Sequence, residues 1–257
     1  MNRPILSACL AMAALAGLAG PVAAQEVVRI GTTPESYPPY SWVDAQGKLN
    51  GFEIELGDAL CAQMQVKCEW VLQSWDGIIP ALQEKKFDAI IASMSVTDER
   101  KQVVDFSDKY YNSPAEFVGR KDETVDISPD GLKGKTVGVQ ISTVHASYIE
   151  AKYKGIVTIK TYDTQENANL DLIAGRVDLL LADGLALDSF LKSADGADFD
   201  VKGKPFIDPM MGDGVGVAVR KDDTALRDKF SAAIKAIRAN GVYKAINDKY
   251  FSFDIYG

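Results

Sequence analysis

The sequence has very few of the residues on which metal sites and nucleophilic enzymes depend. Its 257 residues include a single histidine, His145, and three cysteines. A Ser–His–Asp or Cys–His arrangement needs that histidine, and a zinc site of His and Cys needs several such residues. Neither common glycine-rich phosphate loop is present. The sequence therefore predicts no metal and no cofactor. We expect His145 to be an exposed helix residue, with contact to a ligand as the alternative.

Positive charge is also in deficit. Lys and Arg number 28 against 36 Asp and Glu, which gives a formal net charge of −8. An acidic chain is poorly suited to bind nucleic acid or an anionic membrane surface, so we expect no nucleic-acid partner. The same charge is compatible with a cationic ligand. After residue 24 no apolar run is long enough for a membrane span.

The first residues have the pattern of a secretory signal peptide. Arg3 is followed by an apolar stretch over residues 5–19, and small residues lead up to Ala24. We therefore expect export to the periplasm, with cleavage after Ala24. Lipidation at Cys9 is a weaker alternative, because the apolar stretch follows this cysteine instead of preceding it.

Two cysteines remain after the predicted cleavage, Cys61 and Cys68. An even pair in an exported protein favours a disulfide. The alternative is two free buried thiols.

Strand and helix patterns alternate along the rest of the chain, with short loops between them. The expected strands cover residues 27–32, 69–72, 87–92, 115–120, 136–140, 157–161, 177–183 and 212–219. The expected helices begin near residues 51, 76, 97, 143, 164, 223 and 243. This alternation predicts an α/β protein with parallel sheets, whose ligands bind at the carboxyl ends of the strands.

The stretch from Asp88 to Arg100 carries the clearest functional signal. A buried strand ends in Ser93 and Ser95, and a helix capped by Thr97 begins directly afterwards. Free backbone amides at the helix start and the guanidinium of Arg100 then lie together, which suits a carboxylate. The alternative is a solvated surface arginine after an ordinary turn.

A similar pattern returns ninety residues later. Residues 87–93 and 177–183 both follow a helix and end in a polar residue, Ser93 in one case and Asp183 in the other. If two similar lobes face each other, Arg100 and Asp183 together would hold a zwitterion. For Asp183 the alternative is an Asx turn in a loop.

Two aromatic residues follow predicted strands of the first half, Tyr37 and Trp75. Their rings could stack on the two faces of a ligand side chain, and a Trp face also suits a cation. The alternative is a pair of ordinary core or surface aromatics.

Taken together, these features resemble the family 3 periplasmic solute-binding proteins of ABC transporters, most closely those for lysine/arginine/ornithine, histidine and opines. The resemblance covers the whole mature chain. The stretches that carry it are 51–56, 61–68 (the disulfide loop of the cationic amino acid binders), 88–100, 137–140 and 250–256.

The resemblance implies a two-lobe, type II periplasmic-binding-protein fold. Each lobe would be a mainly parallel sheet flanked by helices, and two hinge strands would join the lobes. The implied division is a signal peptide at 1–24, a first lobe of 25–113 plus 216–257, a second lobe of 116–208, and hinge strands at 113–116 and 208–216.

The resemblance also implies the roles of the site residues. Arg100 would bind the α-carboxylate, helped by the amide of Ser95 and by amides near Thr143 and Val144. The ammonium would be bound by Asp183 and Ser93, and the side chain would lie between Tyr37 and Trp75. The full expected lining is Glu35, Tyr37, Trp75, Ser93, Met94, Ser95, Arg100, Ser142, Thr143, Val144 and Asp183.

Two segments depart from the cationic binders. The loop 33–36 is one residue longer, and the acid that reads the ligand side chain in those proteins has no clear counterpart. Glu35 is a candidate replacement; the alternative is that nothing replaces it. The loop 141–144 is also altered. Both changes concern the choice of side chain and leave the zwitterion anchor intact.

The implied function is capture of a polar amino acid, cationic by expectation (Arg, Lys, ornithine or His), or of an opine. The ligand would be delivered to ABC permease subunits, and the protein would act as a monomer. The alternative is an enzyme on the same fold, similar to a periplasmic cyclohexadienyl dehydratase. That alternative is disfavoured because no general acid is evident between Arg100 and Asp183.

Overall fold

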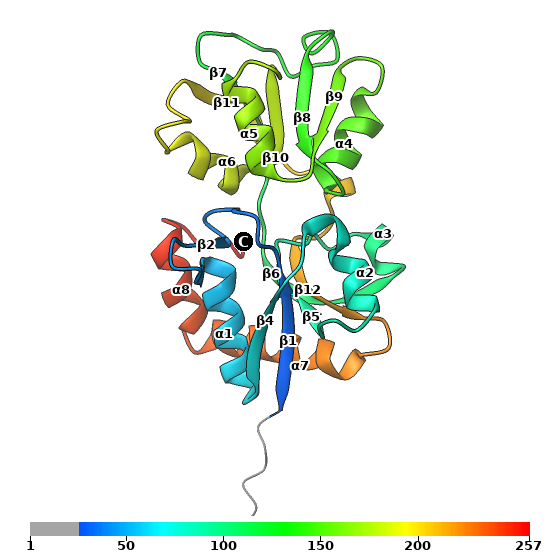
Figure 1. Cartoon of the computed structure of the whole chain (residues 1–257), viewed down its shortest axis with the longest axis vertical. Coiled ribbons are helices and arrows are strands. Elements are labelled where there is room, and N and C mark those ends of the chain that lie inside the picture. Colours follow the sequence, from blue (N-terminus) through cyan, green and yellow to red (C-terminus); the bar gives the residue numbers. More distant parts are fainter. Residues whose placement is uncertain (1–25) are drawn as a thin grey trace, which may run out of the picture.

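Two five-stranded sheets, each covered by helices on both faces, form two lobes that lie one above the other in Figure 1. The computed structural model describes residues 26–257. The predicted signal peptide and its cleavage after Ala24 therefore lie outside the described residues. The predicted α/β fold with two lobes is confirmed.

The lower lobe contains the first sheet, in the order β4-β1-β5-β12-β6. Its strands are β1 (Val27–Thr32), β4 (Lys67–Leu72), β5 (Ala89–Ile90), β6 (Val104–Tyr111) and β12 (Val215–Arg220). The small β2 (Trp42–Val43) and β3 (Leu49–Asn50) pair with each other. The helical segments of this lobe are α1 (Phe52–Met64), η1 (Trp75–Gly77), α2 (Ile78–Gln83), α3 (Asp98–Lys101), α7 (Thr224–Ala239) and α8 (Val242–Tyr250).

The upper lobe contains the second sheet, which read from the other edge has the order β9-β8-β10-β7-β11. Its strands are β7 (Ala115–Arg120), β8 (Thr136–Gln140), β9 (Thr158–Tyr162), β10 (Leu179–Asp183) and β11 (Phe199–Phe206). Its helices are α4 (Val144–Tyr153), α5 (Gln165–Ile173) and α6 (Gly184–Leu191). The 3₁₀ turn η2 (Pro209–Met211) follows β11.

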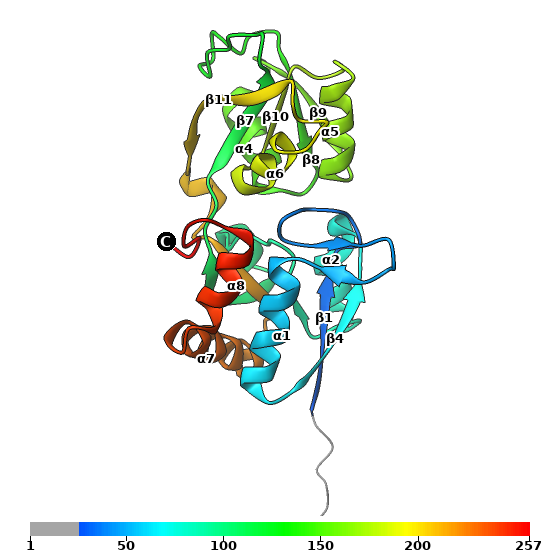
Figure 2. The same cartoon turned by 90° about the vertical axis from the view of Figure 1, so that its left-hand side faces the viewer.

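The two lobes share one topology. In each sheet the first three strands are parallel, and the fourth is antiparallel to both of its neighbours. The antiparallel strand is the one that has just crossed over, β12 in the lower lobe and β7 in the upper lobe. The crossing segments are 112–114 and 207–214, and Figure 2 shows them running side by side on one side of the molecule.

The sequence repeat at residues 87–93 and 177–183 has a structural counterpart. Asp88 accepts a hydrogen bond from the backbone N–H of Arg29 on β1, at 3.0 Å. Asp178 accepts the corresponding bond from Thr136 on β8, at 2.6 Å. Each aspartate therefore fixes the start of the third strand of its sheet, β5 or β10, against the neighbouring strand β1 or β8. Both third strands end at the cavity between the lobes.

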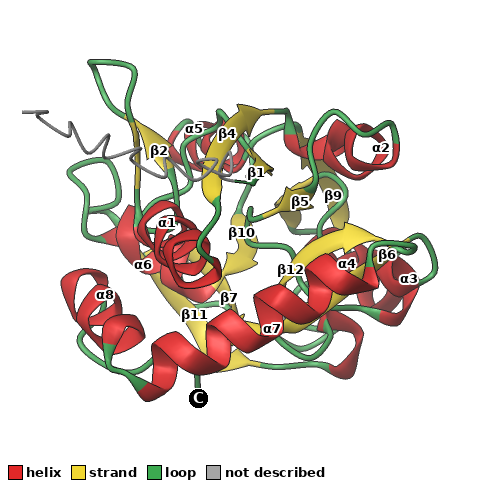
Figure 3. Ribbon diagram, turned by 90° about the horizontal axis from the view of Figure 1, so that it is seen from below, coloured by secondary structure: helices red, strands yellow, loops and turns green. Residues whose placement is uncertain are grey.

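Each sheet separates two apolar layers. In the lower lobe, Phe52, Leu56 and Phe230 pack on one face, while Leu82 and Phe87 pack on the other. Seen from below, the long helix α7 lies across this lobe (Figure 3). The two layers hold the strands rigidly, so the loops at the strand ends are presented to the cleft from fixed positions.

Several local predictions need correction. β5 is only two residues long, because the chain leaves the sheet early and Ser93 adopts a positive φ of 54°. The helix expected to begin near residue 76 starts with the 3₁₀ turn η1, and α2 begins after Gly77 without a side-chain cap. The sequence prediction did not include β6, β11 or α6.

Candidate functional site

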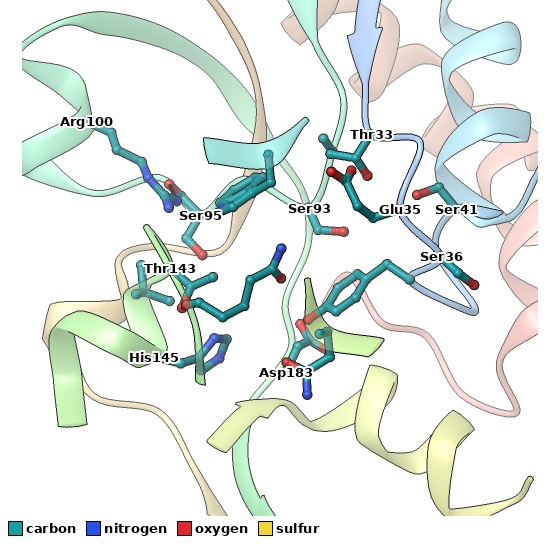
Figure 4. Close-up of a pocket in the computed structure, with 16 residues that line it drawn as sticks. Thr33, Glu35, Ser36, Ser41, Ser93, Ser95, Arg100, Thr143, His145 and Asp183 are labelled. Atoms are coloured by element: carbon teal, nitrogen blue, oxygen red, sulfur yellow. Dashed lines mark hydrogen bonds between the residues drawn. The ribbon is translucent and has the colours of Figure 1, made fainter. Parts of the chain in front are cut away.

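A polar cavity lies between the two lobes, at the carboxyl ends of β1, β5, β8 and β10 (Figure 4). Its volume is about 60 Å³. One water needs about 10–15 Å³ on the same scale, so the cavity has room for several waters. The residues that line it are Thr33, Glu35, Ser36, Tyr37, Ser41, Trp75, Ala92, Ser93, Ser95, Arg100, Gln140, Thr143, Val144, His145, Gln165 and Asp183.

Arg100 supplies the positive charge of the cavity. Thr97 caps α3 and accepts a hydrogen bond from the Arg100 backbone N–H at 3.2 Å, which fixes the start of that side chain. The guanidinium donates to the carbonyls of Ser95 and Ser142, both at 3.0 Å. Burial lowers its pKa to about 10, so it stays cationic at neutral pH. A guanidinium has five N–H groups, which leaves donors for a carboxylate.

Asp183 supplies a negative charge from the other lobe. Its Oδ1 accepts hydrogen bonds from the Tyr40 hydroxyl (2.9 Å), the Ser113 hydroxyl (2.6 Å) and the backbone N–H groups of Leu185 (3.0 Å) and Ala186 (3.3 Å). Asp183 therefore caps α6 and also faces the cavity. Within the described chain, all of these bonds use the same oxygen. Burial raises the pKa of the carboxyl, although the donors from Ser113 and Tyr40 oppose the rise.

Ser93 is held by a residue that the sequence analysis did not single out, Glu53. The backbone N–H and the hydroxyl of Ser93 both donate to the Glu53 carboxylate, at 2.7 and 3.0 Å. The Tyr110 hydroxyl donates to the same carboxylate. Glu53 is fully buried in the first turn of α1, and burial raises its pKa to about 7. In the sequence, the signal that could have pointed to Glu53 is the position of this acidic residue next to the apolar stripe of a core helix.

The two aromatic residues occupy different positions. The Trp75 indole donates to the carbonyl of Ile141 across the cleft at 3.0 Å, and its ring lies 5.4 Å from the Arg100 guanidinium carbon. Tyr37 stacks on Tyr40, with ring centroids 5.8 Å apart and planes 24° from parallel. Trp75 thus bridges the lobes, while Tyr37 is supported from the lower lobe.

Glu35 contributes a carboxylate oxygen that has no hydrogen-bond partner. Its Oε2 is buried and unpaired among the described residues, and the side chain lines the cavity. A buried, unpaired carboxylate oxygen is costly, because it has lost its water and gained no donor. A cationic group in the cavity would remove this cost.

Met94 and Ser142 do not line the cavity. Met94 lies between two serines that line the cavity, but its own side chain is buried in the core of the lower lobe. Ser142 lies at the rim, where its hydroxyl donates to Asp76 at 2.5 Å and its carbonyl accepts from Arg100. Asp76 and Ser142 therefore join the lobes beside the cavity.

The expectation that His145 is an exposed helix residue is wrong, because its side chain lines the cavity (Figure 4). Burial, with the nearby charge of Arg100, lowers its pKa to about 4, so the imidazole is neutral at neutral pH. Several other polar lining residues were not predicted, since they lie in loops or at the ends of strands and helices, where periodicity gives no signal. These are Thr33, Ser36, Ser41, Gln140 and Gln165.

The described residues contain no cluster of three or more His, Cys, Asp or Glu arranged to hold a metal. No helix in residues 26–257 combines the length and apolar character of a membrane span. The predicted disulfide between Cys61 and Cys68 is present, and it joins the end of α1 to β4, away from the cavity.

Comparison with known proteins gives consistent results. Residues 28–253 match the family model of bacterial extracellular solute-binding proteins, family 3. An L-arginine-binding protein of Pseudomonas aeruginosa is 47% identical, covering 91% of this chain and 92% of that protein. The lysine/arginine/ornithine-binding periplasmic protein of Escherichia coli is 39% identical over the full length of both.

A solved structure of a periplasmic binding protein of Salmonella typhimurium, described for its high arginine specificity, has the same fold. It superposes with a TM-score of 0.81 at 37% identity, covering 88% of this chain and all of that one.

Proposed function

We propose that this chain, which belongs to the bacterial extracellular solute-binding proteins of family 3, binds a cationic amino acid in the interlobe cavity. Its relatives include periplasmic proteins that bind lysine/arginine/ornithine and histidine, and an ABC transporter arginine-binding protein. The protein is accordingly a periplasmic solute-binding protein of ABC transport and not an enzyme, which removes the dehydratase alternative.

The arrangement of charges supports an α-amino acid as the ligand. Arg100 projects from the lower lobe and keeps free N–H groups. Asp183 projects from the upper lobe, and its Oδ2 takes part in none of its hydrogen bonds to the described residues. We assign the ligand carboxylate to Arg100, helped by amides at Ser95, Thr143 and Val144. We assign the ammonium to Asp183.

The single observation that carries the choice of a cationic side chain is the buried, unpaired Oε2 of Glu35. Glu35 lies far from Arg100 across the cavity in Figure 4, so a ligand anchored on Arg100 extends toward it. Tyr37 and Trp75 line the space between and would contact the aliphatic part of the side chain. Lysine, ornithine and arginine have this shape, as does the arginine part of an opine such as octopine.

The contacts across the cleft support closure of the two lobes around the ligand. Arg100, Trp75 and Asp76 of the lower lobe bond to residues 141 and 142 of the upper lobe. We propose that the lobes, 25–113 plus 216–257 and 116–208, hinge at 113–116 and 208–216. A ligand that touches both lobes would favour the closed form.

The proposal extends to the partners. The family implies permease subunits of an ABC transporter, to which the closed form would deliver the ligand. We propose that the protein acts as a monomer, with no nucleic-acid partner and with signal-peptide cleavage after Ala24.

The test is the effect of Glu35→Gln on a cationic and a neutral ligand, L-arginine and L-glutamine. A hydrogen bond between a buried carboxylate and a cation is worth about 1.5–3 kcal/mol, so arginine affinity should fall about tenfold or more. Affinity for glutamine should change little or rise. Glu84→Gln, whose carboxylate pairs with Lys86 on the surface, is the matched control. Equal arginine affinity in all three proteins would refute the assignment of Glu35.

A further inference from the structure

Glu53 is the most completely buried carboxylate near the cavity, yet it does not line the cavity. Among the described residues, no cationic side chain forms a hydrogen bond or an ion pair with the Glu53 carboxylate. Its partners are three donors: the backbone N–H of Ser93, the hydroxyl of Ser93 and the hydroxyl of Tyr110. A carboxylate kept in the core without a counterion suggests a role that an apolar residue would not fulfil.

When Glu53 is ionised, the hydrogen of the Ser93 hydroxyl is committed to its carboxylate. Ser93 has a left-handed backbone with φ of 54°, a conformation uncommon for serine, and both its N–H and its hydroxyl reach the same carboxylate. A hydroxyl has one hydrogen and two lone pairs. Because the hydrogen points to Glu53, the side of Ser93 Oγ that lines the cavity can only accept.

The position of Ser93 fits an ammonium acceptor. Ser93 and Asp183 both line the cavity (Figure 4). An ammonium needs several acceptors, since it has three donors and no lone pair. Asp183 offers Oδ2, and Ser93 offers the lone pairs that Glu53 leaves free.

We propose that Glu53 is a positioning residue that orients the Ser93 hydroxyl as an acceptor for the ligand's α-ammonium. This inference rests on the proposed amino acid ligand. Ser93 separates Glu53 from the cavity, so the negative charge of Glu53 also favours a cation beside Ser93. Conversely, an ammonium there favours the ionised form of Glu53, whose pKa burial and the charge of Asp183 raise.

Glu53→Gln should reverse the direction of the Ser93 hydroxyl hydrogen while keeping the shape of the side chain at position 53. Oε1 of Glu53 receives the Ser93 backbone N–H, which can only donate. The glutamine must therefore keep its carbonyl oxygen at that position and place its NH₂ group opposite Ser93 Oγ. The hydroxyl then has to accept from the amide, and its hydrogen turns away from residue 53, toward the cavity. An ammonium would then meet a donor.

The test compares L-arginine with 5-guanidinopentanoic acid, which is arginine without the α-amino group, by titration calorimetry. We expect the wild type to prefer arginine. Glu53→Gln should reduce this preference by about tenfold or more, because it weakens the binding of arginine and leaves the affinity for the analogue unchanged. Glu55→Gln is the control on the same helix. Its carboxylate bonds to Lys249 and Tyr250, away from the cavity, so the preference should not change.

A variant at Ser93 distinguishes orientation from a general structural effect. Ser93→Ala removes the acceptor and should by itself reduce the preference, and Glu53→Gln should have little further effect on the preference in that background. If Ser93→Ala keeps the full preference, the proposal is overturned whether or not Glu53→Gln folds. Equal loss of both ligands in Glu53→Gln, or the same loss of preference with and without Ser93, would also overturn it. Failure of the wild type to bind arginine would instead refute the proposed ligand class, and this inference with it.

Discussion

Replacing Arg100 by alanine should nearly abolish binding of every amino acid. The guanidinium is the only cationic group among the residues that line the cavity, and it is held in place by carbonyls of both lobes. Without it, the ligand carboxylate would be buried with no counterion, at a cost of about 3–5 kcal/mol. At 1.4 kcal/mol per tenfold, the dissociation constant should rise by about two to three and a half orders of magnitude.

The assay is titration calorimetry with L-arginine, supported by thermal unfolding of the unliganded variant to show that it is folded. Arg100→Lys should recover only part of the loss, because an ammonium cannot form two parallel bonds to a carboxylate. The matched control is Arg227→Ala, which breaks a surface pair with Asp105 at 2.7 Å and should leave affinity unchanged. If Arg100→Ala binds arginine within tenfold of the wild type, the carboxylate has been assigned to the wrong group.

Three further predictions concern other parts of the molecule. His145 is the only histidine, so its proton NMR signal can be followed alone; it should titrate near pH 4 instead of 6.5, and a ligand carboxylate beside Arg100 should shift the midpoint upward. A midpoint near 6.5 would contradict its burial. Reducing the disulfide, or replacing Cys61 and Cys68 by alanine, should lower the free energy of unfolding by about 2–3 kcal/mol, measured in urea, with little effect on affinity. Trp75→Phe keeps an aromatic wall but removes a hydrogen bond across the cleft, so affinity should fall about two- to tenfold; unchanged affinity would show that this bond does not stabilise the closed form.

Much of the architecture was predictable from local patterns. The strand β1, the helix starts near residues 51 and 143 and the N-cap at Thr97 are confirmed at or within a residue of their expected positions. These signals are local, since they depend on residues within one or two turns. The repeat that includes Asp183 also predicted that two strand ends face each other, because the two lobes share a topology.

The residues that were missed depend on contacts between distant segments. Glu53 resembles an exposed acid at a helix start, and only its contact with Ser93, forty residues away, shows that it is buried. His145 became a cavity residue because α4 faces the other lobe. Met94 was expected in the cavity from the resemblance, but its side chain packs in the core of the lower lobe, where the chain has already left β5.

The most direct test of the proposed ligand is a calorimetric titration of the mature protein with L-arginine, L-lysine, L-glutamine and L-glutamate. Arg100 lies at one end of the cavity, and the Oε2 of Glu35, unpaired among the described residues, lies at the other, so we expect saturable one-to-one binding of a cationic amino acid. We also expect a preference of at least about 100-fold over L-glutamate. Tighter binding of glutamate, or no binding of either cationic amino acid, would contradict the proposed ligand.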